Sequence, residues 1–306
     1  MYLNVSILAT FGSLALAANP DKPAINPGTD WQTRETGLLN NLPPVGSRRD
    51  HWAEEWIPTS CKEKTKDYHK DPADITVWDT HYDDCSAPWT MCRHKDCSSS
   101  EDELTEYFGR VPIHMRQWIR HVICMPETGG AIAYAVGGGD IIWEKKVSLS
   151  TFLHEVSHHL DQSALPQFTQ PFSDSNEWQS GYAMDSATIT GYGRSNWREN
   201  FADTAPDAIY DKVVAGGFES INPSWETVSH QYTSYQDYLG DMILPGGTCD
   251  MRRDNSPTVA KADGDQSALQ FDLGTRPDMS IKDENITVIE NDAAAEGLKL
   301  CEGRHV

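Results

Sequence analysis

The sequence predicts an α+β fold in which a small twisted sheet packs on one helix, above a mostly helical lower part. Residues 129–136 and 140–144 are two strand-like runs separated by glycines. Apolar residues then recur at helical spacing over 149–160, which indicates a half-buried helix. The region before residue 126 is rich in cysteine and tryptophan, so we expect a compact layer held together by disulfides there.

Four parts follow from these changes of composition along the 306 residues. We expect a signal peptide over 1–18 and a Cys/Trp-rich region over 19–125. The core with the two strands and the helix spans 126–248, and an acidic tail spans 249–306. No internal repeat is present.

The N-terminus has the pattern of a secretory signal peptide. Residues 5–17 are apolar or small, and Ala15-Leu16-Ala17 is an A-x-A cleavage signal, which predicts cleavage near Ala17 or Ala18. A buried N-terminal helix is the alternative. No later segment reaches transmembrane length, so we expect a soluble, secreted, extracellular protein. Asn285 begins an N-glycosylation acceptor sequence, which agrees with export.

Composition narrows the classes of partner. Hydrophobic residues make up 38% of the chain, which is typical of a globular protein. The formal net charge is −21, from 46 acidic and 25 basic residues. An acidic surface repels phosphate backbones and anionic lipids, so nucleic acid and membrane surfaces are not expected partners. The charge identifies neither a substrate nor an oligomeric state.

Seven cysteines indicate disulfides in an exported chain, and the odd number leaves one thiol free or paired between chains. Their spacings do not fit a zinc ribbon. We expect two local bridges among Cys61, Cys85, Cys92 and Cys97, and a bridge from Cys249 to Cys301 in the tail.

The remaining elements follow in chain order. Residues 18–50 are rich in Pro, Asn and Gly and predict an extended arm, whereas 103–123 predict helical stretches interrupted at Gly109 and Pro112. The tryptophans between 51 and 125 are expected in the core, although a carbohydrate-binding role is the alternative. Ser148 or Ser150 caps the first core helix, and a loop of about thirty residues follows Pro166. A second helix starts near Ser195 or Asn196 and runs towards Tyr210, and 218–248 are again helical.

The first core helix contains His154-Glu155-Val156-Ser157-His158. Residues four apart lie on one helix face, so the two imidazoles can occupy adjacent corners of a tetrahedral zinc site. Glu155 then faces the open position, where it would act as general base on a metal-activated water. The alternative is a solvated helix with three polar residues, but the apolar stripe beside the histidines and the two preceding strands, as in zincins, argue against it.

A catalytic zinc needs a third protein ligand. The metzincin pattern is excluded because Ala164 stands where that pattern has histidine. The G-T-x-D pattern of deuterolysins is also absent, since Ala183-Met184 precedes Asp185. Glu199, on the second predicted helix, is the remaining candidate.

Two segments resemble a known family. Residues 154–161 (HEVSHHLD) and 192–202 (YGRSNWRENFA) look like the catalytic segments of the gluzincins related to anthrax lethal factor, with Ser195 where that family has threonine. The resemblance covers about fifty residues. It implies a zincin-like fold, with Glu199 as third ligand, Tyr192 as oxyanion donor and Asp161 near the ligand helix. More loosely, the whole chain resembles a group of secreted fungal proteins named as conidiation-specific.

These residues together predict a secreted zinc endopeptidase that acts on a protein or peptide substrate with one Zn²⁺ bound by His154, His158 and Glu199. Glu155 and Tyr192 are the expected catalytic residues. Asp203 lies on the face of Glu199 and could hydrogen-bond a ligand histidine; a surface position is the equal alternative. His159 is expected in solvent or in a supporting hydrogen bond. Two other functions stay open: a zincin-fold binding or coat protein without peptidase turnover, and a zinc hydrolase acting on a non-peptide amide.

Overall fold

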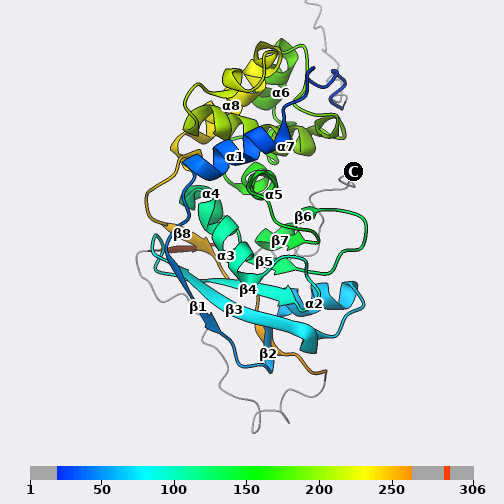
Figure 1. The fold of residues 1–306 in the computed structure, drawn as a ribbon, viewed down its shortest axis with the longest axis vertical. Helices are drawn as coiled ribbons and strands as arrows, with labels where there is room; N and C mark the ends of the chain where they lie inside the picture. The colour runs from blue at the N-terminus through cyan, green and yellow to red at the C-terminus, as the bar shows by residue number, and fades with distance from the viewer. Residues whose placement is uncertain (1–18, 264–285, 290–306) are drawn as a thin grey trace, which may run out of the picture.

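A computed structural model describes residues 19–263 and 286–289 of the chain. Within these residues it contains eight α-helices and ten strands (Figure 1), which confirms the mixed α+β class. The predicted signal peptide, Asn285 and Cys301 lie outside the described residues. No helix in the described ranges is long and apolar enough to cross a membrane.

The helices differ widely in length and are α1 (Trp31–Asn41), α2 (Thr59–Asp67), α3 (Glu101–Arg110), α4 (Ile113–Arg116), α5 (Leu149–Ser163), α6 (Asn176–Met184), α7 (Trp197–Val213) and α8 (Ser229–Leu239). The strands are β1 (Ser47–His51), β2 (Trp56–Pro58), β3 (Ile75–Tyr82), β4 (Trp89–His94), β5 (His121–Cys124), β6 (Ala133–Val136), β7 (Asp140–Trp143), β8 (Met251–Arg253), β9 (Thr258–Ala260) and β10 (Thr287–Ile289).

Six strands form the main sheet, in the order β1-β3-β4-β5-β7-β6. The pairs β4–β5 and β5–β7 are parallel, whereas β1–β3, β3–β4 and β6–β7 are antiparallel. Edge strand β6 is therefore antiparallel to the three parallel strands β4, β5 and β7. The sheet joins strands from the Cys/Trp-rich region to strands β6 and β7 of the predicted core.

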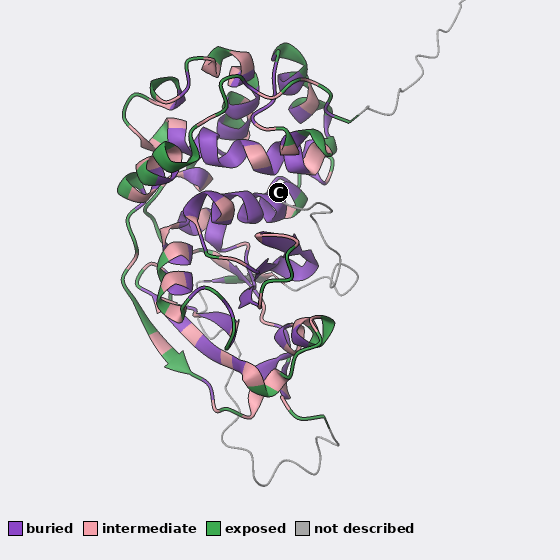
Figure 2. Cartoon of the chain, turned by 45° about the vertical axis from the view of Figure 1, so that its right-hand side comes forward, coloured by how far each residue is buried: buried purple, intermediate pink, exposed green. Residues whose placement is uncertain are grey.

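Two hydrophobic clusters cover the two faces of this sheet, because successive strand residues point to opposite faces. Trp78, Met91 and Trp143 face the larger cluster, which extends through α3, α5, α7 and α8. Val77 and Ile142, their neighbours in sequence, face a smaller cluster with Ile57 and Cys61 near β2 and α2. Figure 2 shows the buried residues concentrated through the middle of the molecule, where α5 and α7 lie.

Several elements differ from the sequence prediction. The expected arm over 18–50 contains α1 and β1, and the expected loop after Pro166 contains α6. Strands β3 and β4 lie in the region where we expected only a compact disulfide-rich layer. The β3 sequence ITVWDTHY largely alternates apolar and polar residues, and its buried positions follow that alternation closely. The expected core role holds for Trp78 and Trp89, which are fully buried.

A three-glycine turn joins β6 to β7, as predicted. Gly138 has φ +83°, and a Cβ there would lie 2.9 Å from the Arg120 guanidinium, so both backbone and space favour glycine. The same guanidinium makes two hydrogen bonds of 2.7 Å to the carboxylate of Asp140. This buried bidentate pair holds the start of β7 against the segment leading into β5.

Three disulfides occur in the described residues, and their pairing corrects our expectation. Cys61 bonds Cys92, Cys85 bonds Cys249, and Cys97 bonds Cys124. Only the first bridge is local to the early cysteines, and Cys249 is not paired with Cys301. The sequence could not show this, because the meeting of Cys85 and Cys249 depends on how the chain returns to the loop after β3 once α8 has ended.

Candidate metal centre

Helix α5 presents the first two candidate ligands. The helix begins after Ser148, whose hydroxyl accepts the N–H of Thr151 at 3.3 Å. Its apolar stripe, with Phe152, Val156 and Leu160 fully buried, fixes the helix against the sheet and α7. His154 and His158, one turn apart, are both buried on the side that faces α7.

Helix α7 supplies the third candidate ligand. Asn196 caps this helix by accepting the N–H of Glu199 at 3.0 Å. The next residue, Asn200, accepts a hydrogen bond from the Trp178 indole and donates to Thr188 and Gln231. These bonds hold the first turn of α7 against α6, α8 and the preceding loop. Asn200 lies within the segment 192–202, but no role for its side chain was expected from the sequence.

The three candidate ligand atoms form a nearly equilateral triangle. Nε2 of His154 and Nε2 of His158 are 3.2 Å apart. Oε2 of Glu199 lies 3.3 Å from the first and 3.4 Å from the second. Two ligand atoms bound at tetrahedral angles to one zinc, each about 2.0–2.1 Å from it, would be about 3.3 Å apart. The triangle therefore has the dimensions of one face of a zinc tetrahedron.

Burial and charge at Glu199 also fit a cation. The residue is fully buried, and neither carboxylate oxygen meets hydrogen-bond geometry with a donor among the described residues. Burial raises the pKa of Glu199, but the neighbouring His158 and His154 outweigh it and bring the pKa well below its usual value. A buried carboxylate is costly without compensation, and a bound cation would supply that compensation. Across the described ranges, this is the one group of three His, Cys, Asp or Glu residues whose ligand atoms converge in this way.

The two residues with predicted catalytic roles lie beside this triangle. Glu155 is fully buried on α5 between the two histidines in sequence. Tyr192 lies in a short 3₁₀ turn, Tyr192–Arg194, and its ring centroid is 6.0 Å from that of His154. The structure therefore brings all five predicted residues into one region, although their roles remain predictions.

Asp203 links a ligand to the turn that carries Tyr192. One of its oxygens lies 3.8 Å from Nδ1 of His154, and the other accepts the hydroxyl of Thr190. The Thr190 oxygen in turn accepts the backbone N–H of Tyr192 at 3.0 Å. Thr190 was missed from the sequence because a lone threonine in a loop carries no pattern.

Asp161 and His159 are hydrogen-bonded to residues outside the triangle. Asp161 accepts the N–H and the hydroxyl of Ser173 at 2.6 and 2.8 Å, and so anchors the loop after α5. Burial raises the pKa of Asp161 to about 7, against the effect of those two hydrogen bonds. His159 is buried, and its Nε2–H donates to the backbone oxygen of Asp140 at 3.1 Å. The supporting hydrogen bond expected for His159 is thus present, and solvent exposure is excluded.

A family comparison decides between the two resemblances seen in the sequence. The model described as "Conidiation-specific protein Con-13" matches residues 28–259, which is most of the chain. The chain belongs to the Con-13 family. The matched residues include all three candidate ligands. The match supports the looser of the two resemblances, the one to conidiation-specific proteins.

One curated member of the Con-13 family was compared directly. Conidiation-specific protein 13 of Neurospora crassa is 27% identical over 186 residues, which cover 58% of this chain and 53% of the relative. The chain thus spans about half the length of the curated relative it matches. No solved structure matches the chain.

Membership of the Con-13 family corrects two expectations. The assignment to the gluzincins related to anthrax lethal factor is wrong as a family assignment, since the match over residues 28–259 is to conidiation-specific proteins. The expected endopeptidase and metalloprotease function is corrected with it, because the matching family and the matching relative are both named as conidiation-specific proteins and neither is named as a peptidase. The similarity was confined to about fifty residues, too few to define a family for the chain.

Proposed function

We propose that this Con-13 family member is a secreted zinc-binding protein whose zincin-like centre serves a purpose other than peptide hydrolysis. The observation that carries the proposal is the triangle of 3.2, 3.3 and 3.4 Å among His154, His158 and Glu199. Two imidazoles and one carboxylate are the donor set of zinc sites that keep a fourth position open. A zincin-like build is supported by the antiparallel edge strand β6 next to β7, with α5 packed against β6.

Secretion is supported by the three disulfides of the described residues, because such bonds persist in oxidising compartments. N-terminal sequencing of protein collected from the medium of an expressing fungus checks this, and cleavage near Ala17 or Ala18 is expected. Retention of the whole chain inside the cell would contradict it.

Among non-peptidase roles, the centre favours a hydrolase of a non-peptide amide, such as an acetamide in a wall polymer. Zinc, when bound, supplies Lewis acidity that polarises a substrate carbonyl. Glu155 would accept a proton from the attacking water and pass it to the leaving nitrogen. The Tyr192 hydroxyl would donate to the oxygen on which negative charge develops. A binding or coat protein without turnover is the second candidate, supported by the family description, which names no enzyme.

Metal content tests the first part of the proposal. We expect one zinc per chain by elemental analysis of the purified protein, and loss of that zinc in His154→Ala and Glu199→Ala. The matched control is His69→Asn, because His69 is exposed with φ +54°, a conformation that asparagine also tolerates. Zinc retained by both ligand variants, or no zinc in the native protein, would contradict the site.

Turnover tests the second part. Native protein is incubated with an N-acetylated chitin hexamer, and acetate release is measured beside Glu155→Gln. We expect the variant to keep zinc but to lose at least about a hundredfold in rate. A native protein that holds zinc and releases no acetate would instead favour the binding or coat role.

A further inference from the structure

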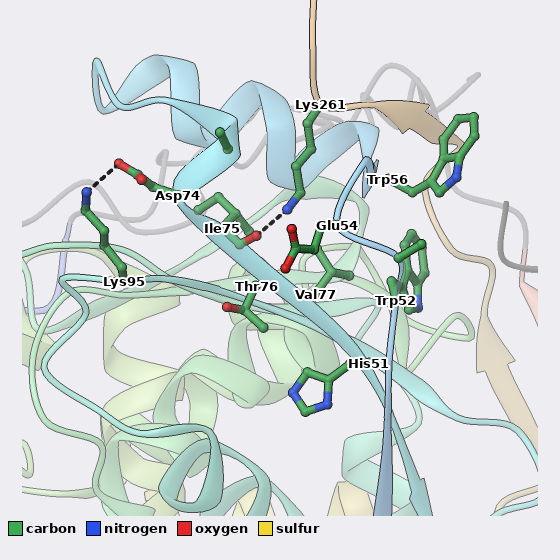
Figure 3. A pocket seen from close by; sticks show the side chains of 12 residues that line it. His51, Trp52, Glu54, Trp56, Asp74, Ile75, Thr76, Val77, Lys95 and Lys261 are labelled. Carbon is green, nitrogen blue, oxygen red and sulfur yellow. Dashed lines mark hydrogen bonds and ion pairs between the residues drawn. The ribbon is translucent and has the colours of Figure 1, made fainter. Parts of the chain in front are cut away.

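A cavity of about 500 Å³ lies near the N-terminal end of β3, away from the metal centre. Four parts of the chain line it: the turn 51–56 between β1 and β2, residues 73–77 at the start of β3, Lys95 after β4, and Lys261 after β9 (Figure 3). The lining residues Trp52, Ile75 and Val77 belong to the smaller hydrophobic cluster, on the sheet face opposite α5. Sites for small ligands typically enclose about 300–1,000 Å³, so this cavity has a suitable size.

Backbone hydrogen bonds hold the walls of this cavity in place. The N–H of Trp52 donates to the oxygen of Val77 at 3.0 Å, and the N–H of Lys261 donates to the oxygen of Glu55 at 2.8 Å. Trp56 is paired with Ala260 in the β2–β9 ribbon. A ligand would therefore meet a preformed site and would not have to order a loop.

Two indoles form one wall of the cavity. Figure 3 shows Trp52 and Trp56 close together on the same side. Trp52 is largely buried and Trp56 is half-buried, so both rings are held firmly while part of the Trp56 surface stays accessible. A rigid aromatic face binds the apolar C–H face of a ring-shaped ligand by dispersion and by its quadrupole.

Polar groups of both signs line the rest of the cavity. Figure 3 shows the exposed Glu54 carboxylate facing the side of the cavity where the Lys261 ammonium lies. That ammonium donates to the backbone oxygen of Ile75 at 2.6 Å, and Lys95 pairs with Asp74 at 3.0 Å. Donors and acceptors are thus interleaved around an aromatic wall.

This combination selects a neutral, hydroxyl-rich ligand. A hydroxyl both donates and accepts, so the hydroxyls of a sugar ring can pair with Glu54 and Lys261 together. The charges of the lining balance, since Glu54 and Asp74 stand against Lys95 and Lys261. The pocket therefore offers a phosphate-bearing ligand no excess positive charge, and the chain as a whole carries a net charge of −21, which opposes its binding. A purely apolar ligand would leave the polar groups without partners, at a cost.

We propose that this pocket binds a neutral oligosaccharide, with a sugar ring stacked on Trp56 and its hydroxyls paired with Glu54 and Lys261. The site would hold the protein on a polysaccharide surface. It does not depend on the metal centre, so it can be tested whether or not the chain binds zinc.

Isothermal titration of the full chain with chitohexaose, laminarihexaose and cellohexaose tests the proposal. At least one of these neutral hexamers is expected to bind. Glu54→Gln should weaken that binding about tenfold by removing a charge-assisted hydrogen bond, and Trp56→Ala should weaken it at least as much. The control is Trp31→Ala, because Trp31 is 49% exposed on α1 and outside the pocket, and this variant should bind as the native protein does.

Trp56→Ala removes part of the smaller cluster, so thermal unfolding of each variant is measured alongside. Glu54→Gln alters an exposed side chain and carries the test if Trp56→Ala fails to fold. Absence of heat with all three hexamers at millimolar concentration would overturn the proposal, as would native affinity in Glu54→Gln. Chelation of zinc should leave the binding unchanged, which separates this result from the metal proposal.

Discussion

The carboxylate of Glu35 accepts the backbone N–H of Ser150 at 2.9 Å and the hydroxyl of the same residue at 2.6 Å. The other carboxylate oxygen accepts the N–H of Leu149 at 2.6 Å. A side chain from α1 thus satisfies the first turn of α5, the helix that carries His154 and His158. Arg34, next to Glu35, pairs with the buried Asp207 of α7 at 2.9 Å. Helix α1 therefore braces both helices of the metal centre.

Glu35→Ala should lower the free energy of unfolding by about 2–4 kcal/mol, because it leaves buried N–H groups of α5 without an acceptor. Urea denaturation measures this. The comparison variant is Asp30→Ala, which removes the exposed cap of α1 and its 2.8 Å bond to Thr33, and its expected cost is clearly smaller than that of Glu35→Ala. Equal losses in the two variants would show that Glu35 acts as an ordinary surface cap.

The bridge from Asp203 through Thr190 to the Tyr192 turn should govern zinc affinity and turnover differently, if the proposed centre holds zinc. Asp203→Asn, which weakens support at His154, should lower zinc affinity about tenfold. Thr190→Val should lower zinc affinity less than Asp203→Asn does. It should reduce acetate release, because it leaves the N–H of Tyr192 without the Thr190 oxygen as acceptor. Competition with a chromogenic chelator and the acetate assay measure the two effects. Ser195→Ala is the control, because its exposed hydroxyl belongs to the same turn and donates to the backbone oxygen of Tyr192 at 2.7 Å. The prediction is wrong if Thr190→Val behaves like this control.

His121 should make the fold sensitive to mild acid. It is fully buried, and its Nδ1–H donates to the Thr90 oxygen while Nε2 accepts the N–H of Ser256, both at 3.1 Å. Burial lowers the pKa of His121 to about 3. The folded pKa lies below the ordinary value of about 6.5, so the stabilising contribution is complete above pH 6.5 and is lost as the pH falls towards 3.

Linkage at this one site predicts a loss of about 2 kcal/mol between pH 7.5 and pH 5. Denaturation curves at the two pH values measure it, and His121→Gln, which cannot titrate there, should show a correspondingly smaller loss. The prediction is wrong if the native protein and the variant lose the same stability over this interval.

Two disulfides should contribute unequally to stability. Cys85–Cys249 closes a separation of 164 residues, and Cys61–Cys92 closes one of 31. Each bridge lowers the conformational entropy of the unfolded chain. By loop length alone, this stabilises the folded state by about 5 kcal/mol for Cys85–Cys249 and about 4 kcal/mol for Cys61–Cys92. Paired Cys→Ser variants in guanidinium unfolding should therefore rank in that order. The reverse ranking would mean that local packing around each bridge outweighs loop length.

Local patterns predicted the elements whose signals lie within a few residues. The helical spacing over 149–160, the cap at Asn196 and the glycine turn before β7 all appear where expected. Helix α1 and strand β1 were not predicted, because their sequences are polar and exposed and carry little periodicity. Their stability comes from tertiary contacts, such as those of Glu35 and the pairing of β1 with β3.

The spacing of His154 and His158 was sufficient by itself to place two imidazoles on one helix face, because helix geometry depends only on neighbours along the chain. The convergence of Glu199, the bridge from Asp203 to Thr190 and the bond between Cys85 and Cys249 each depend on how distant segments pack. The same is true of the pocket formed by Trp56, Glu54 and Lys261. Such contacts are selected by the free energy of the whole core, so only the tertiary structure decided them.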